Sequence, residues 1–202
     1  MDNSSLSLPA AIFILFLFTT HPNYCLSARK HLSSESDTDT DFIRSSCNAT
    51  IYPDLCFATF SSYATEIQSD SKILATMSLT LALNTTLSAS QTLTDLGKTQ
   101  GLEPKEAAAL HDCVEQISDS VDEFTRSISE MEETQGKSFA FRMSDVETWV
   151  SAALTDEDTC IDGFSENAMD ADVKAAVATV IEKVAQLTSI SLAFVNQYAG
   201  SK

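Results

Sequence analysis

The chain has 202 residues and a formal net charge of −17, from 29 acidic and 12 basic residues. This length suits one domain plus a processed segment. Such a negative charge disfavours binding to nucleic acid, anionic lipid and polyanionic polysaccharide, but it is compatible with a basic protein partner.

The N-terminus has the pattern of a secretory signal peptide. Residues 8–18 form an apolar run that is shorter than the roughly 20 apolar residues needed to span a bilayer. The small residues Ser27 and Ala28 follow, just before two basic residues. We therefore expect residues 1–28 to be a signal peptide and the mature protein to be secreted. Because the start carries Asp2 and no Lys or Arg, a retained signal anchor is the alternative. We expect no later segment to span a membrane.

Residues 29–41 are rich in Ser, Asp and Thr and nearly free of apolar side chains, so we expect a flexible leader. The alternating aspartates in this segment resemble the opening of a calcium loop. However, Phe42 stands where that loop needs Gly and Asn48 where it needs Glu, so we expect no calcium site. The folded domain is expected to span residues 42–202.

The folded part is predicted to be all-helical. Around Pro53 we expect two short helical pieces joined by a turn. Four long helices should follow, with the third beginning at a capping box formed by Ser144 and Glu147. Each long helix has one apolar face and the connections are short, so neighbouring helices should run antiparallel. We expect an up-down-up-down four-helix bundle with an N-terminal helical hairpin, its long helices over residues 71–96, 104–133, 144–164 and from near residue 170.

The cysteines and sequons fit an exported protein. Of the five cysteines, Cys25 leaves with the signal peptide, and an even set of four remains, so we expect two disulfides. Four cysteines allow three pairings, and spacing alone does not choose among them. Asn48 and Asn84 each begin an Asn-x-Thr sequon and are predicted glycosylation sites.

No catalytic constellation is found in the sequence. His111 has no accompanying nucleophile or oxyanion motif and is expected to be a solvated surface residue. There is no G-x-S-x-G, no phosphate-binding glycine loop and no Cys/His set with zinc spacing. We therefore expect a protein that is not an enzyme and has no catalytic residue, cofactor or metal.

An acidic stripe stands out on the second long helix. Glu115, Asp119 and Asp122 are spaced four and three apart, turned away from the apolar seam, and Asp112 and Arg126 extend the stripe. On the third helix, Asp158, Thr159 and Asp162 flank Cys160. The stripe is either a solvated bundle face or a docking face for a basic partner.

Three blocks of sequence resemble the plant invertase and pectin methylesterase inhibitor family, and in order they cover essentially the whole mature chain. The first is Cys47-x8-Cys56 enclosing Tyr52-Pro53-Asp54-Leu55; the second is Ala109-Leu110-His111-Asp112-Cys113-Val114-Glu115, followed by Ser120-Val121-Asp122; the third is Thr148-Trp149-Val150-Ser151-Ala152-Ala153-Leu154, leading to Asp158-Thr159-Cys160.

The resemblance implies a four-helix bundle with disulfides Cys47–Cys56 and Cys113–Cys160. It also implies one-to-one inhibition of an enzyme in the apoplast, without catalysis. In pectin methylesterase inhibitors the bundle covers the pectin-binding cleft of the enzyme through polar residues near the third and fourth cysteines. Carried onto this sequence, those partner-binding positions are Glu115, Asp119, Asp122, Thr159 and Asp162.

Invertase inhibitors carry a Pro-Lys-Phe segment, and this chain has none. We therefore expect pectin methylesterase to be the target, bound by a monomer, with no nucleic acid partner and no membrane partner after signal removal. Inhibition of an acid invertase is the alternative. A third hypothesis is a non-inhibitory module like the pro-regions attached to some pectin methylesterases.

Overall fold

The computed structural model describes residues 37–133, 136–165 and 169–201. The chain divides into two units, Met1–Asp37 and Thr38–Lys202. Apart from Asp37, the first unit lies outside the described residues. The predicted signal peptide, residues 1–28, and the first part of the expected leader therefore lie outside them too.

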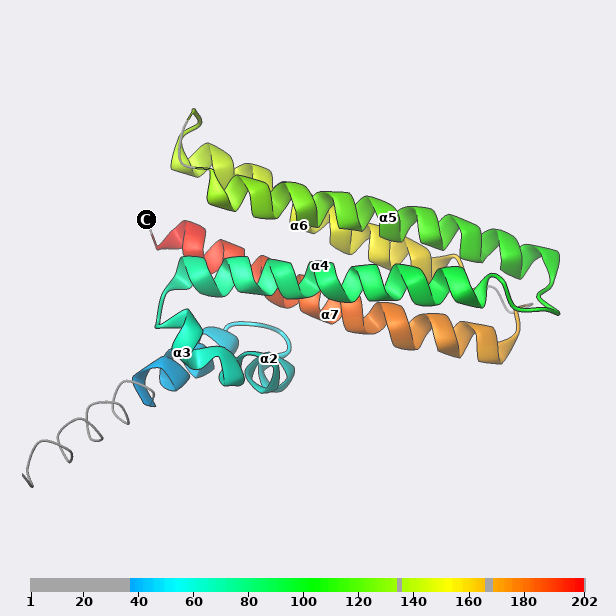
Figure 1. Cartoon of the computed structure of the whole chain (residues 1–202), viewed down its shortest axis with the longest axis horizontal. Coiled ribbons are helices and arrows are strands. Elements are labelled where there is room, and N and C mark those ends of the chain that lie inside the picture. The colour runs from blue at the N-terminus through cyan, green and yellow to red at the C-terminus, as the bar shows by residue number, and fades with distance from the viewer. Residues whose placement is uncertain (1–36, 134–135, 166–168, 202) are drawn as a thin grey trace, which may run out of the picture. The chain divides into compact units, whose positions relative to one another are not determined.

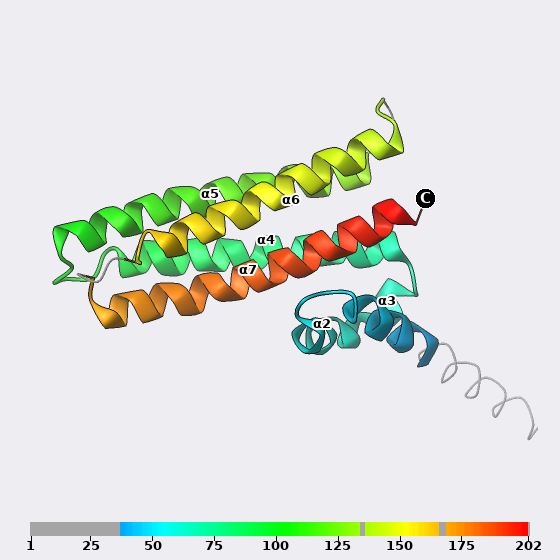
Figure 2. The same ribbon diagram turned by 180° about the vertical axis from the view of Figure 1, so that it is seen from behind.

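Four long helices make up most of the second unit and alternate in direction (Figures 1 and 2). They are α4 (Ser71–Leu96), α5 (Pro104–Glu132), α6 (Phe139–Asp162) and α7 (Ala171–Gly200). Each helix packs against two others, in the order α4–α5–α6–α7 with α7 returning to α4. The described residues contain no strand, so the all-helical fold class is confirmed.

Side-chain caps fix the starts of the four long helices, and at α5 Glu103 and Glu106 form a capping box. Asp70 accepts hydrogen bonds from the backbone N–H groups of the first turn of α4, and Asp170 does the same for α7. The start predicted for the third long helix was wrong. Ser138 is the N-cap of α6 and accepts from Phe141 N, whereas Ser144 lies inside the helix. Ser138 supplies a cap six residues earlier, and the added residues bury Met143 against the core.

The N-terminal hairpin consists of a helix over residues 37–47, then α2 (Pro53–Phe60), the 3-10 helix η1 (Ser61–Tyr63) and α3 (Ala64–Ile67). The first helix begins inside the segment expected to be a flexible leader. Ile43 and Cys47 on this helix are buried, and Ser69 donates a 2.7 Å hydrogen bond to Asp39, which together hold it in place.

The hairpin is tied to the bundle by an aromatic pair and a hydrogen bond. Phe60 and Phe194 meet edge to face with ring centroids 5.5 Å apart, and Gln197 Nε2 donates to the carbonyl oxygen of Ser46 at 3.1 Å. Both rings are fully buried. The hairpin therefore shares a hydrophobic cluster with α7.

The buried stripe of α5 differs from the apolar seam visible in the sequence. Val114, Val121 and Ile128 are only half-buried, while three of the fully buried positions carry small or sulfur-containing side chains: Cys113, Ser120 and Ser127. Ser120 Oγ donates to the carbonyl oxygen of Ala153 on α6 at 3.2 Å. Small residues on this side let α5 and α6 approach closely.

Among the described residues, α4 and α7 are long and apolar enough to cross a membrane by length and composition alone. The core helix of a bundle passes the same test, and both helices bury polar side chains such as Thr86 and Thr188. Their apolar character is used here to pack against neighbouring helices.

Candidate functional site

A disulfide holds α5 and α6 side by side where the acidic residues gather. Cys113 and Cys160 are bonded with a Cα–Cα distance of 4.4 Å, and both are buried. The second disulfide joins Cys47 to Cys56 within the hairpin. Both pairings implied by the family resemblance are present. The Cys113–Cys160 bond also fixes the register of the two helices, so residues near it have defined neighbours.

The acidic groove, as we name it, lies between α5 and α6 beside this disulfide. Glu115 on α5 and Thr159 on α6 both line it, together with Asp112 and Gln116, and its volume is about 520 Å³. Glu115, Asp112 and Thr159 are exposed. The structure therefore brings two of the predicted partner-binding residues, from different helices, to one concave surface.

Farther along the same helix pair, three carboxylates face one another. Asp156 on α6 is half-buried. Its burial, and then the negative charges of Asp119 and Glu123 on α5, raise the pKa of Asp156 to about 6. Arg126 lies 3.5 Å from Glu123 Oε1, while Glu123 Oε2 is buried without a hydrogen-bond partner among the described residues. Sequence reasoning missed Asp156 and Glu123, because only the packing of α6 against α5 places them opposite Asp119.

The other two predicted residues lie elsewhere on these helices. Asp122 is exposed on α5. Asp162 is exposed near the end of α6 and lines a separate groove of about 240 Å³, shared with Lys174 of α7. Asp162 therefore faces the α7 side of α6, away from the groove that Glu115 and Thr159 share.

One cluster has donor groups that could hold a metal ion. The ligand atoms of His111, Asp112 and Glu115 lie within 4.8 Å of one another, and His111 Nδ1 lies 3.7 Å from Asp112 Oδ1. All three side chains are exposed, and exposed acidic groups are common without a bound ion. The cluster therefore gives no ground for assigning a metal.

One of the buried carboxyl groups among the described residues lies on α6. Glu157 on α6 is fully buried, and its Oε1 lies 2.7 Å from Thr188 Oγ1 on α7. Burial first, and then the negative charges of Asp158 and Asp156, raise the pKa of Glu157 to about 8, while the hydrogen bond from Thr188 acts in the opposite direction. Sequence reasoning missed this buried glutamate because Asp156 and Asp158 flank it in the chain, although buried Ala153 and Cys160 lie on the same side of the helix.

Together these features define a helical-bundle protein with a groove, lined in part by the carboxylates of Asp112 and Glu115, between two disulfide-linked helices. Residues 41–194 match the family described as plant invertase/pectin methylesterase inhibitor, and the chain belongs to this family. The family is one of inhibitors rather than catalysts, in agreement with the prediction that the chain is not an enzyme.

Known relatives of this chain include proteins named as pectinesterase inhibitors. The chain is 45% identical to the "21 kDa protein" of Daucus carota, covering 78% of this chain and 83% of the relative. It is 42% identical to pectinesterase inhibitor 10 of Arabidopsis thaliana, covering 83% of this chain and 54% of that longer protein. A crystal structure of a mutant pectin methylesterase inhibitor from Arabidopsis superposes with a TM-score of 0.61 at 18% identity, over 74% of this chain and 92% of that one, and shows a shared fold.

Proposed function

We propose that this chain is a secreted inhibitor of plant pectin methylesterase. It binds the enzyme one-to-one and covers the pectin-binding cleft with the acidic face of α5 and α6. The observation that carries the proposal is the acidic groove beside the Cys113–Cys160 disulfide, in a chain of this family. The relatives named as pectinesterase inhibitors favour the esterase over an invertase.

The physical basis is charge and rigidity. Glu115 and Asp119 project from one helix and Thr159 from its partner, and both helices are long and joined by a disulfide. A surface fixed before binding loses little conformational entropy when the partner docks. Its exposed carboxylates steer a basic partner surface toward it and fix the orientation of docking. Such a surface needs no catalytic group.

Secretion to the cell wall is supported by the signal-peptide pattern of residues 1–28 and by the two disulfides, since disulfides persist in oxidising compartments outside the cytosol. The apoplast is where a pectin-modifying enzyme meets its substrate. Delivery there follows from the same proposal.

A titration tests the proposal. Purified, oxidised mature chain is added to one plant pectin methylesterase and, separately, to one acid invertase. We expect esterase activity to be lost near one-to-one stoichiometry and invertase activity to be unchanged. Loss of invertase activity alone would establish the alternative target, and inhibition of neither would refute the proposed function.

Variants then locate the interface. Asp119→Lys and Thr159→Trp should each weaken esterase inhibition by roughly tenfold or more, because one reverses a steering charge and the other obstructs the groove. Glu182→Lys, an equal charge reversal at an exposed position on α7, is the control and should inhibit as the wild type does. Undiminished inhibition by both groove variants would show that another face binds the enzyme.

A further inference from the structure

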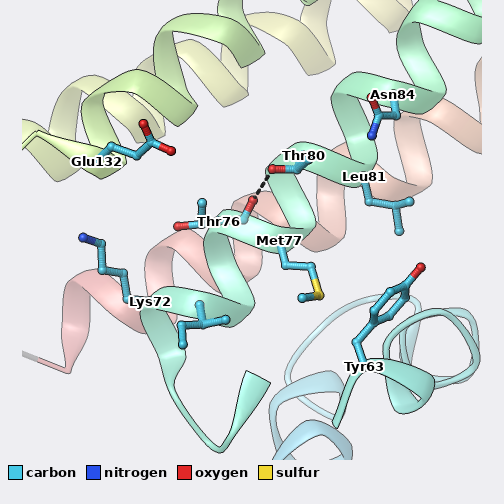
Figure 3. A pocket seen from close by; sticks show the side chains of 9 residues that line it. Tyr63, Lys72, Thr76, Met77, Thr80, Leu81, Asn84 and Glu132 are labelled. Atoms are coloured by element: carbon cyan, nitrogen blue, oxygen red, sulfur yellow. Dashed lines mark hydrogen bonds between the residues drawn. The ribbon is translucent and has the colours of Figure 1, made fainter. Parts of the chain in front are cut away.

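A further groove, mostly apolar, lies along α4. Figure 3 shows the side chains that line it, and its volume is about 580 Å³. Its wall is formed chiefly by Tyr63 of the hairpin and by Ile73, Met77 and Leu81 of α4. Ile73 is 39% exposed. A concave, mostly apolar groove of this volume has the size of a small-ligand site.

Polar groups frame this α4 groove. Lys72, Thr76 and Thr80 of α4 and Glu132 of α5 lie along its edge, and Asn84 lies at one end. None of the five residues predicted to bind the esterase lines it. Whatever occupies the α4 groove therefore leaves the acidic groove free.

Asn84 connects this groove to the sequence. It begins the sequon Asn84-Thr85-Thr86 and is exposed. In Figure 3 its amide nitrogen turns toward Thr80 and Leu81. Thr86 is fully buried and donates to the carbonyl oxygen of Ala82 at 2.8 Å, so an enzyme that recognises the sequon must act before α4 packs into the bundle.

We propose that Asn84 carries an N-linked glycan whose first sugars lie in the α4 groove and cover it. The proposal rests on the secretion that is part of the proposed function. In the modification, Asn84 Nδ2 forms a bond to C1 of an N-acetylglucosamine and gives up a proton. The bond from C1 to the diphosphate of a lipid-linked oligosaccharide breaks, and the lipid diphosphate leaves.

The chemistry of a sugar ring matches this groove. A pyranose ring has a face of C–H groups that packs on aromatic and aliphatic side chains such as Tyr63 and Met77. Its hydroxyl groups lie around the edge, where Lys72, Thr76 and Glu132 offer donors and acceptors. Asn84 is eleven residues beyond Ile73, about 16 Å along a helix axis, which is a span of several sugars. The covalent link holds the glycan at high local concentration, so weak contacts suffice.

The test is oxidation of a methionine in the groove. The full chain is secreted from plant cells, and mass spectrometry of its peptides establishes whether Asn84 is modified. Met77 lines the α4 groove and Met169 lines the acidic groove, and both are half-buried. Oxidation of the two side chains by dilute peroxide is then compared in wild type, in Asn84→Gln and in Asn48→Gln, which removes the other sequon.

We expect Met77 to oxidise at least about threefold faster in Asn84→Gln than in wild type, with Met169 unchanged in both, because the glycan shields the thioether. Asn48→Gln should leave Met77 protected. Trimming the wild-type glycan to a single sugar with an endoglycosidase should give an intermediate rate. An unmodified Asn84, or equal oxidation of Met77 in all samples, would overturn the proposal. If Met77 of Asn84→Gln is protected more strongly at higher protein concentration, the glycan proposal is overturned, because a second copy of the chain then covers the α4 groove.

Esterase inhibition is measured on the same samples. It should be equal in all of them, since the α4 groove and the acidic groove share no residue. If no sample inhibits the esterase while Met77 is protected in the wild type and not in Asn84→Gln, the proposed function is refuted and the glycan proposal is supported. If every sample inhibits fully while Met77 of the wild type is oxidised as fast as in Asn84→Gln, the glycan proposal is refuted and the proposed function is supported.

Discussion

The buried carboxyl of Glu157 predicts a stability that falls as pH rises. Thr188 Oγ1 lies 2.7 Å from Glu157 Oε1 and 3.0 Å from the carbonyl oxygen of Val184. One hydroxyl has one hydrogen to donate. A protonated Glu157 donates to Thr188 and frees that hydrogen for Val184, so the neutral acid satisfies this core network. Glu157 Oε2 has no partner among the described residues, which further disfavours the charged form.

The magnitude follows from linkage. The pKa of Glu157 is raised from its ordinary value of 4.5 to about 8 by burial. The folded state therefore holds a proton that the unfolded state releases. The full stabilisation is present below pH 4.5, declines as pH rises and is lost above pH 8. At 1.36 kcal/mol per pKa unit, the loss is on the order of 3 kcal/mol at pH 7 and 4 to 5 kcal/mol above pH 8. Total stabilities are about 5 to 15 kcal/mol, so the effect is large.

Glu157→Gln isolates this contribution. The amide has nearly the same shape as the acid and has no titrating proton. The free energy of unfolding of the variant, relative to that of the wild type, should therefore rise between pH 5 and pH 8, by roughly 3 kcal/mol at pH 7 compared with pH 4. At pH 4 the variant should be about 1 kcal/mol less stable, because its extra N–H donor lacks a partner. Urea unfolding followed by far-UV circular dichroism measures both.

Glu182→Gln, which removes a charge from an exposed position of α7, is the control and should run parallel to the wild type at every pH. A Glu157→Gln curve that also runs parallel to the wild type would refute the reasoning. It would mean that Glu157 is charged in the folded protein.

Three further predictions concern the disulfides, the close helix pair and the groove carboxylates. The Cys113–Cys160 disulfide closes a loop of 47 residues, so its loss should lower the free energy of unfolding by about 4 kcal/mol. The Cys47–Cys56 disulfide closes a loop of 9 residues, so its loss should cost about 3 kcal/mol. Chemical unfolding measures both, and a larger loss from the shorter loop would contradict the chain-entropy argument. Ser120→Leu should lower the free energy of unfolding by about 1 to 3 kcal/mol because Ser120 is fully buried against α6, whereas exposed Ser118→Leu should change it by no more than about 0.5 kcal/mol. A basic group of the esterase beside Asp156 would lower the pKa of Asp156 from its value of about 6 in the free inhibitor. The affinity for the esterase should therefore fall as pH drops below 6, by at most about tenfold per pH unit, and Asp156→Asn should remove this pH dependence. Tighter binding at lower pH would show that no cation of the esterase contacts Asp156.

Local chemistry and periodicity were enough to predict the helices. The 71–96 range expected for the first long helix coincides with α4, and the start near residue 170 coincides with α7, because Asp70 and Asp170 are strong caps placed directly before apolar repeats. The start of α6 was predicted wrongly because two serines, Ser138 and Ser144, each suit an N-cap. Only the packing of Met143 selects the earlier one.

The sequence by itself determined the fold class and, through its resemblance to a family, the disulfide pairing. Only the tertiary structure decided which side chains are buried and which acidic residues share a groove. Asp156 and Glu157 are adjacent acidic residues in different surroundings. Asp156 faces α5, whereas Glu157 is buried in the core beside Thr188 of α7. Whether a side chain is buried depends on how two helices pack against each other. The sequence of one helix does not state where the neighbouring helix lies.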